Sequence, residues 1–190
     1  MEHLKRLKIG IAGCGGIGSN VAYHLVRNGV LELKFGDFDI VEESNLNRQF
    51  FFKDQIGLFK SEELFKNLKK INPLGNYSYK IIKFDRTNIC DFFKDVDIVI
   101  EAFDKKEMKV MLVEELLPRG KVIILASGIG GYETKDIEVK KINNNFIIVG
   151  DLKNDTDFYK TYSHKVSMIS CIMTEIALKK GGFLKWRGNE

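Results

Sequence analysis

The feature that most constrains the fold is an apolar run that ends in a glycine cluster near the start of the chain. Residues 7–19 read LKIGIAGCGGIGS. This order is typical of a β-strand, a tight turn and the start of a helix, and Gly13, Gly15 and Gly18 fit the spacing G-x-G-x-x-G. Such glycines permit a close backbone approach to a phosphate, and the helix start offers it free N–H groups. The pattern therefore predicts a phosphate-binding loop.

Residues 31–35 read LELKF and predict a second strand, whose end delivers Asp37. Asp37 follows the glycine loop by about 20 residues, the usual distance for a carboxylate that accepts from ribose hydroxyls. Asp39 points the same way if the strand geometry continues, which makes it a second candidate for the ribose. The alternative is a solvated acidic turn. Together with the glycine loop, this spacing predicts a nucleotide site.

Strand-like and helix-like patterns alternate along the rest of the chain until the glycine-rich turn near residue 130, and a hairpin pattern and a last helix follow. This alternation predicts an α/β, Rossmann-like, doubly wound and mostly parallel sheet with an antiparallel hairpin near the C-terminal end. No linker divides the chain, so we expect a single domain over residues 1–190. The expected strands span residues 7–12, 31–35, 77–84, 97–102, 121–126, 137–142 and 146–149, and the expected helices begin near residue 17 and span 61–71, 105–117 and 165–180.

Composition narrows the class of protein. A hydrophobic share of 44% with 29% charged residues is ordinary for a soluble globular chain. The net charge of +4 is too small to indicate a nucleic-acid partner. No apolar run approaches the roughly 18 residues of a membrane span, and the N-terminal residues do not resemble a signal peptide. We therefore expect a cytoplasmic protein without a membrane or nucleic-acid partner.

The cysteines and histidines indicate neither a disulfide scaffold nor a metal site. The three cysteines are far apart and form no C-x-x-C pair, so we expect a reducing compartment and no zinc. Cys171 stands among apolar residues and is expected in the core. Cys14 is expected to be a small filler of the glycine loop, with a lowered thiol pKa if it is exposed near the helix start. The histidines show no ligand spacing, and we assign them no role.

Residues 44–49 read SNLNRQ and combine amides with a guanidinium. If this segment returns toward the glycine loop, Arg48 lies beside the phosphates, where its planar fork can bind two oxygens. Lys60, just before a predicted helix, adds a second positive charge. The alternatives are an arginine on the surface and a lysine that faces solvent at a helix start.

Asp104 stands just beyond the apolar strand 97–102. A carboxylate there, facing two cationic residues and a triphosphate, is a suitable ligand for Mg²⁺, which takes one or two carboxylates plus phosphate oxygens and water. Asp104 also has the position of an N-cap residue for the helix 105–117. Composition and spacing leave both roles open.

Taken together, these segments resemble the ThiF/MoeB/HesA family, the bacterial relatives of ubiquitin-activating enzymes, over about residues 9–131. The compact length and the segments EAFDKK and SGIGGY look most like the short ThiF-type sulfur carrier protein adenylyltransferases. The resemblance rests on these residues: the loop Gly13-Cys14-Gly15-Gly16-Ile17-Gly18-Ser19, the pair Asp37 and Asp39, the run Ser44-Asn45-Leu46-Asn47-Arg48-Gln49, then Gly57, Lys60, Asn72-Pro73 and Asp104.

The resemblance implies an enzyme that uses ATP and Mg²⁺ to adenylylate the C-terminal glycine of a ubiquitin-like sulfur carrier ending in Gly-Gly. The thiamine (thiazole) pathway is favoured over a molybdopterin-type carrier, and a homodimer is expected. The resemblance also assigns residues. The nucleotide contacts are Gly13, Gly15, Gly16, Gly18, Asp37, Asp39, Asn45, Arg48 and Lys60; the catalytic residues are Arg48, Lys60 and Asp104; and Asp104 is the magnesium ligand.

Two other functions share parts of this pattern. An NAD-dependent oxidoreductase has the glycine loop and the ribose carboxylate, but the sequence offers no acid/base pair for hydride transfer and leaves SNLNRQ without a purpose. A non-catalytic subunit would keep the fold and bind a carrier. The presence of Arg48, Lys60 and Asp104 together argues against it.

Overall fold

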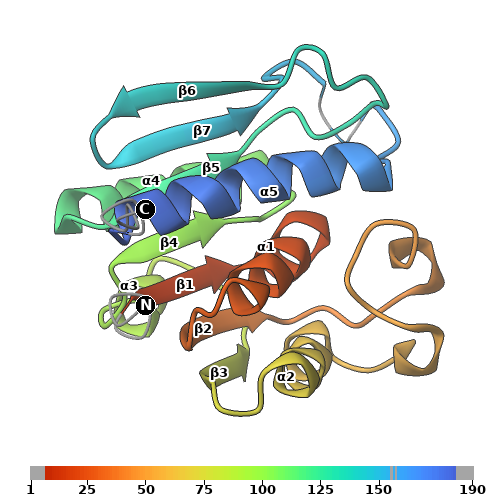
Figure 1. Cartoon of the computed structure of the whole chain (residues 1–190). Coiled ribbons are helices and arrows are strands. Elements are labelled where there is room, and N and C mark those ends of the chain that lie inside the picture. Colours follow the sequence, from red (N-terminus) through yellow and green to blue (C-terminus); the bar gives the residue numbers. More distant parts are fainter. Residues whose placement is uncertain (1–6, 155, 157, 183–190) are drawn as a thin grey trace, which may run out of the picture.

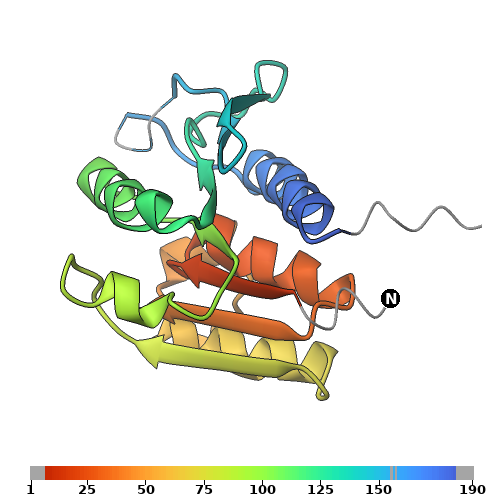
Figure 2. The same ribbon diagram turned by 90° about the vertical axis from the view of Figure 1, so that its left-hand side faces the viewer.

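The computed structural model describes residues 7–154, 156 and 158–182, which form a seven-stranded sheet covered by helices on both faces (Figures 1 and 2). The strand order is β3-β2-β1-β4-β5-β7-β6. The strands are β1 (Lys8–Ala12), β2 (Glu32–Asp37), β3 (Asn76–Ile81), β4 (Ile98–Glu101), β5 (Val122–Ala126), β6 (Glu138–Asn143) and β7 (Phe146–Gly150). The α-helices are α1 (Gly16–Arg27), α2 (Lys60–Ile71), α3 (Ile89–Phe92), α4 (Lys106–Leu116) and α5 (Ser163–Lys180).

All neighbouring strands are parallel except β6 and β7, which form an antiparallel hairpin. The predicted α/β, mostly parallel sheet with a C-terminal hairpin is therefore confirmed. The chain leaves β1 toward β2 and β3 on one side and returns to β4 on the other side. The carboxyl ends of β1 and β4 thus flank the point where the strand order reverses, which is where doubly wound sheets bind ligands.

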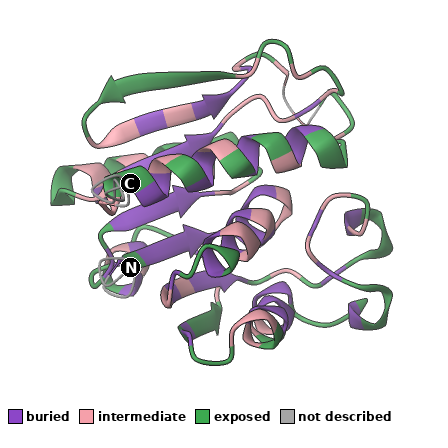
Figure 3. Ribbon diagram, viewed as in Figure 1, coloured by how far each residue is buried: buried purple, intermediate pink, exposed green. Residues whose placement is uncertain are grey.

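Alternate residues of the central strands enter two separate cores. Ile98 and Ile100 join the core beneath α1, α2 and α5, whereas Val99 between them joins the core beneath α3 and α4. Because both faces are covered, β4 and β5 are apolar along nearly their whole length and buried in Figure 3. The rigid centre of the sheet holds the strand ends in fixed positions.

The structure differs from the expected elements at the strand after α2. The sequence predicts a strand over residues 77–84, but β3 ends at Ile81, which pairs with Asp37, the last residue of β2. Because β2 ends at Asp37, the residues after Ile81 have no neighbouring strand among the described residues to pair with. Phe84 instead packs its ring on Phe92 and Phe93, with ring centroids 5.1 and 5.4 Å away. The four-residue helix α3, which carries Phe92, is not predicted from the sequence.

A buried ion pair attaches the first turn of α5 to the end of β7. Lys165 is fully buried, and its ammonium group donates to Asp151 Oδ2 at 2.5 Å and to the Gly130 carbonyl. Asp151 Oδ1 also accepts the N–H groups of Lys153 and Asn154, each at 2.9 Å. Burial raises the pKa of Asp151, but these donors outweigh it and hold the pKa at about 2. The pair therefore fixes α5 against the loops after β5 and β7.

None of the helices within these described ranges is both long and apolar enough to cross a bilayer.

We predict that Asp151→Asn destabilises the fold by about 3 kcal/mol at pH 7, because it leaves the Lys165 charge buried without a counterion. The folded pKa of Asp151 is depressed, so its contribution is present above the unfolded pKa and is lost as pH falls from about 4 to about 2. The destabilisation should therefore shrink by about 1 kcal/mol between pH 7 and pH 3 in urea unfolding.

The exposed carboxylate of Asp136 in the preceding loop provides the control. Asp136→Asn should change the free energy of unfolding by less than about 0.5 kcal/mol at either pH. An Asp151→Asn effect of the same size at both pH values would contradict the proposed titration.

Candidate active site

The glycine loop lies at the carboxyl end of β1 and runs directly into α1. Gly13 has φ of 93°, in the left-handed region that favours glycine. A Cβ on Gly18 would lie 1.9 Å from the Gly13 carbonyl oxygen, so only glycine permits this close approach of helix to loop. The first turn of α1 follows the carboxyl end of the central strand β1, and no side chain caps its free N–H groups. This geometry is suited to binding an anion.

Asp37 joins the glycine loop to the end of β2. It is buried, its Oδ2 accepts the Cys14 N–H at 2.6 Å, and its Oδ1 accepts the Asp39 N–H at 2.9 Å. The neighbouring Gly13 N–H donates to the Gly36 carbonyl at 3.0 Å. Burial raises the pKa of Asp37 above its usual value, although the two N–H groups and Lys60 act in the opposite direction.

The structure agrees with Cys14 as a small filler and removes the condition for a lowered thiol pKa. Its side chain is fully buried in the core beneath α1, and burial followed by the charge of Asp37 raises its thiol pKa well above the usual value. Cys14 is therefore a small core residue, and its thiol is not activated by the helix start.

Lys60 is the first residue of α2 and is buried, so a lysine facing solvent is excluded. Its ammonium group forms an ion pair with Asp39 Oδ2 at 3.1 Å, and its N–H donates to the Asp39 carbonyl at 2.9 Å. The Asp39 side chain remains half exposed. The next residue, Ser61, donates its hydroxyl to the Asp37 carbonyl. Lys60 and Asp37 are therefore placed at the same strand end.

Arg48 lies against the glycine loop, as expected. Its side-chain Cγ would be 3.7 Å from a Cβ on Gly16, and Asn20 Nδ2 donates to both the Gly16 and Arg48 carbonyls at 2.6 and 2.8 Å. The guanidinium is held by the Ser44 carbonyl at 2.9 Å and by Asn47 Oδ1 at 2.7 Å. Burial lowers the pKa of Arg48. The stem is thus packed, and the cationic head is held by two neutral acceptors.

Asn45 is buried but engaged within its own segment. Its Oδ1 accepts the Glu42 N–H at 3.1 Å, its Nδ2 donates to Ser44 Oγ at 3.3 Å, and its carbonyl accepts the N–H groups of Arg48 and Gln49. Asn45 therefore shapes the 3₁₀ turn Glu43–Asn45 that positions Arg48. The sequence did not predict this structural role.

Gln49 is buried, yet its Oε1 has no hydrogen-bond partner among the described residues. Its amide nitrogen would lie 3.8 Å from a Cβ on Gly15, so the side chain lies along the glycine loop. A buried amide without a partner costs about 1–3 kcal/mol. Gln49 was part of the SNLNRQ run but was not assigned a contact from the sequence, which cannot reveal an unpaired atom.

The loop after β4 touches the glycine loop from the other side. A Cβ on Gly13 would lie 2.8 Å from the Ala102 carbonyl oxygen. The fully buried Glu101 anchors this loop: its Oε1 accepts the Phe103 N–H at 2.7 Å, and its Oε2 pairs with Lys109 of α4 at 2.9 Å. Burial raises the pKa of Glu101. Glu101 thereby holds the loop that carries Asp104.

Asp104 is exposed and does not cap α4. The N-cap residue is Lys105, and no side chain caps the helix, so the N-cap role is wrong. The Asp104 carboxylate makes no hydrogen bond or ion pair with any described residue. It is suited to Mg²⁺ as one carboxylate alongside phosphate oxygens and water. The described part of the chain holds no group of three or more His, Cys, Asp or Glu that would bind a metal ion alone.

The family model for the ThiF family matches residues 1–146. This chain belongs to the ThiF family. The match includes every candidate site residue from Gly13 to Asp104 and extends to the start of β7.

This chain is also similar to curated proteins that are much longer than it. Adenylyltransferase and sulfurtransferase UBA4 of Candida glabrata is 33% identical over 128 residues, which are 67% of this chain and 30% of that protein. The chain thus spans about 30% of the length of the curated relatives it matches.

Two solved structures show the same fold. E. coli tRNA N6-threonylcarbamoyladenosine dehydratase, TcdA, in complex with ATP has a TM-score of 0.87 at 21% identity, over 99% of this chain and 92% of that chain. E. coli MccB with AMPCPP and MccA has a TM-score of 0.78 at 22% identity, over 96% of this chain and 58% of that chain.

We predict that Gln49→Met stabilises the protein by about 1 kcal/mol, because it removes a buried oxygen that has no partner. The matched control is Gln55, which is also buried but donates to Glu63 and Asn67 and accepts the Phe52 N–H. Gln55→Met should destabilise by about 2 kcal/mol or more, since it leaves those partners unpaired. Urea unfolding measures both, and a loss of stability in Gln49→Met would contradict the assignment.

Proposed function

We propose that this protein is an ATP-dependent adenylyltransferase. In the proposed reaction a protein C-terminal carboxylate attacks the α-phosphorus of ATP, giving a carrier acyl-adenylate and pyrophosphate. The observation that carries the proposal is the arrangement of Arg48 and the buried Lys60 around the glycine loop, with Asp37 at the adjoining strand end.

We propose one orientation for the nucleotide across the carboxyl ends of β1 and β2. We propose that the phosphates lie on Gly13, Gly15, Gly16 and Gly18, at the positive end of α1. The ribose hydroxyls then reach Asp37, whose oxygens each retain a lone pair, and Asp39. The Asn45 carbonyl accepts the Arg48 N–H, and Asn45 is proposed to position Arg48 for the phosphates. The unpaired Gln49 Oε1 can only accept a hydrogen bond, and we propose that it accepts one from a hydroxyl or amino group of the nucleotide.

The two cations are proposed to stabilise the charge that develops on the phosphate oxygens. Lys60 gives up little solvation when the nucleotide binds, because it is already buried. Arg48 exchanges two neutral acceptors, Ser44 and Asn47, for phosphate oxygens, which form stronger charge-assisted hydrogen bonds. The attacking group is already a carboxylate, so the reaction needs positioning and charge stabilisation rather than a general base.

We propose that Asp104 binds the Mg²⁺ that accompanies ATP. The ion would neutralise phosphate charge and bind phosphate oxygens together with water. Asp104 has a free carboxylate on the loop that contacts Gly13, and Glu101 and Lys109 fix that loop from within the core.

The proposed substrate is a small ubiquitin-like sulfur carrier that ends in Gly-Gly. The ThiF-type motifs in the sequence favour a carrier of thiamine biosynthesis, and a molybdopterin-type carrier is the alternative within this class. The names of the relatives support an adenylyltransferase, and E. coli MccB has been solved with both AMPCPP and MccA.

The proposal predicts exchange of pyrophosphate into ATP that depends on Mg²⁺ and the carrier. Arg48→Ala and Asp104→Ala should each lower the exchange rate by on the order of 10², the usual cost of removing one charge-stabilising contact. Lys66→Ala is the control, because Lys66 is an exposed lysine on the same helix as Lys60 and pairs only with Glu62 and Glu63 among the described residues. It should keep the wild-type rate.

Wild-type exchange in both Arg48→Ala and Asp104→Ala would refute the site. ATP binding without any exchange, in the presence of carriers of both pathways, would instead indicate a non-catalytic subunit. Thermal protection by NAD but not by ATP would indicate a dehydrogenase.

We also propose a homodimer that covers the segment between β2 and α2. Large apolar side chains of this segment are exposed by 40–51%, and an isolated β-bridge joins Ile40 to Phe59. Such a cluster is unusual on the surface of a monomer. The exposed residues are Phe38, Ile40, Phe52, Ile56, Leu58 and Phe59.

We predict that Leu58→Glu weakens self-association at least about tenfold in analytical ultracentrifugation, because it introduces a charge into the contact. Leu74→Glu is the control: Leu74 is 87% exposed but lies in the turn before β3, outside this segment. A monomeric wild type, or equal association of both variants, would contradict the dimer.

A further inference from the structure

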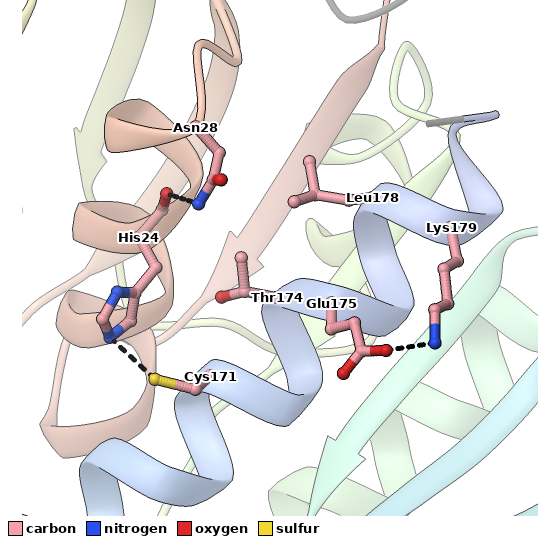
Figure 4. Close-up of a pocket in the computed structure, with 7 residues that line it drawn as sticks. All are labelled: His24, Asn28, Cys171, Thr174, Glu175, Leu178 and Lys179. Carbon is pink, nitrogen blue, oxygen red and sulfur yellow. Dashed lines mark hydrogen bonds and ion pairs between the residues drawn. The ribbon is translucent and has the colours of Figure 1, made fainter. Parts of the chain in front are cut away.

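A cavity of about 390 Å³ lies between α1 and α5, away from the glycine loop (Figure 4). His24 and Asn28 line it from α1, and Cys171, Glu175 and Lys179 line it from α5. Pockets of this size hold small molecules. The function proposed above makes no use of this cavity.

Cys171 and His24 meet at this cavity. The Cys171 Sγ lies 3.3 Å from His24 Nε2, and Figure 4 shows the two side chains pointing toward each other. Cys171 is exposed, so the expectation that it lies in the core is wrong. The histidine that the sequence left without a role is therefore the neighbour of a thiol accessible to solvent.

The surroundings keep this pair neutral. Burial raises the pKa of the Cys171 thiol and lowers the pKa of His24. Glu175 and Lys179, the charged groups of α5 that line the cavity, form an ion pair with each other. From α1, the Tyr23 ring packs on His24. In the tautomer that carries its proton on Nδ1, the Nε2 atom is placed to accept the thiol proton.

The other two cysteines lack such a base. Cys14 is fully buried beside Asp37. Cys90 is partly buried, and its Sγ lies 3.5 Å from the carboxylate of Glu115, whose negative charge disfavours a thiolate there, whereas Cys171 has a neutral imidazole beside it. Of the chain's three cysteines, Cys171 is therefore the one placed for nucleophilic chemistry.

We propose that Cys171 and His24 form a site for thiol–disulfide exchange with a small peptide-type disulfide. His24 Nε2 accepts the thiol proton as the Cys171 sulfur attacks one sulfur of the disulfide. The S–S bond of the small molecule breaks, a mixed disulfide forms on Cys171, and the departing thiolate takes the proton from the imidazolium. The disulfide is itself the oxidant, so the step balances without another reactant.

The cavity favours an amino-acid-derived disulfide. Glu175 and Lys179 present one charge of each sign, which complements a molecule that carries both ammonium and carboxylate groups. Glutathione disulfide has these groups, whereas hydroxyethyl disulfide has neither. Comparing the two compounds therefore tests recognition by the Glu175 and Lys179 charges separately from the reactivity of the Cys171 thiol.

The helix that carries Cys171 also contacts the start of α1. Ser170, next to Cys171, donates its hydroxyl to the Ile17 carbonyl at 3.5 Å, and Val166 lies 3.2 Å from the position of a Cβ on Gly16. A group attached to Cys171 would occupy space between the two helices that hold the glycine loop.

The test incubates the purified full chain with glutathione disulfide from pH 6 to pH 9 and follows each cysteine by peptide mapping. At pH 7 Cys171 should form the mixed disulfide at least about tenfold faster than Cys90, and His24→Gln should remove that advantage. Cys90→Ser should leave the Cys171 rate unchanged. The wild-type Cys171 rate should be nearly constant from pH 7 to pH 8, whereas a thiol without a base reacts about tenfold faster per pH unit.

Two results would overturn the proposal: a Cys171 rate no greater than that of Cys90, or an unchanged Cys171 rate in His24→Gln. The wild-type pH profile decides the base even if His24→Gln fails to fold. Equal rates with glutathione disulfide and hydroxyethyl disulfide would overturn the peptide-type ligand. None of these outcomes depends on ATP or on pyrophosphate exchange.

Discussion

The candidate active site depends on one buried carboxylate that joins two neighbouring strand ends. Asp37 accepts the Cys14 N–H of the glycine loop and the Asp39 N–H of its own loop, so β1 and β2 deliver their loops as one unit. Without these hydrogen bonds, the turn that exposes the start of α1 would lose its support against β2. The same carboxylate stands beside the buried ammonium of Lys60. The Asp37 carboxylate thus supports both the geometry of the glycine loop and the local stability of the two strand ends.

The sequence predicted much of this arrangement because backbone requirements leave clear signals. The close approach of Gly18 to the Gly13 carbonyl demands glycine, and residues buried on both sheet faces give the continuous apolar runs of β4 and β5. The hairpin of β6 and β7 follows from its sequence pattern in the same way. These features are local, so they can be recognised without knowing the packing.

Features that arise only from packing were missed or mistaken. The burial of Lys60 and the unpaired oxygen of Gln49 depend on neighbours brought in by other segments. Cys171 was wrongly expected in the core, although the spacing of the apolar residues along α5 places it beside the buried face of the helix. The buried positions Val166, Ile169, Met173 and Ala177 recur every three or four residues, and Cys171 falls two residues from Ile169, to one side of that stripe.

The contact between α1 and α5 also has a consequence for the order of folding. Ser170 and Ile17 are separated by 153 residues, yet they share a hydrogen bond beside the glycine loop. Contacts of such long range form late, because the intervening chain must first be ordered. The strands β1 to β5 precede α5 in the chain, so during synthesis the part of α1 that packs on α5 stays uncovered until α5 has been made. The phosphate-binding loop, first in the sequence, is therefore among the last parts to gain its full packing.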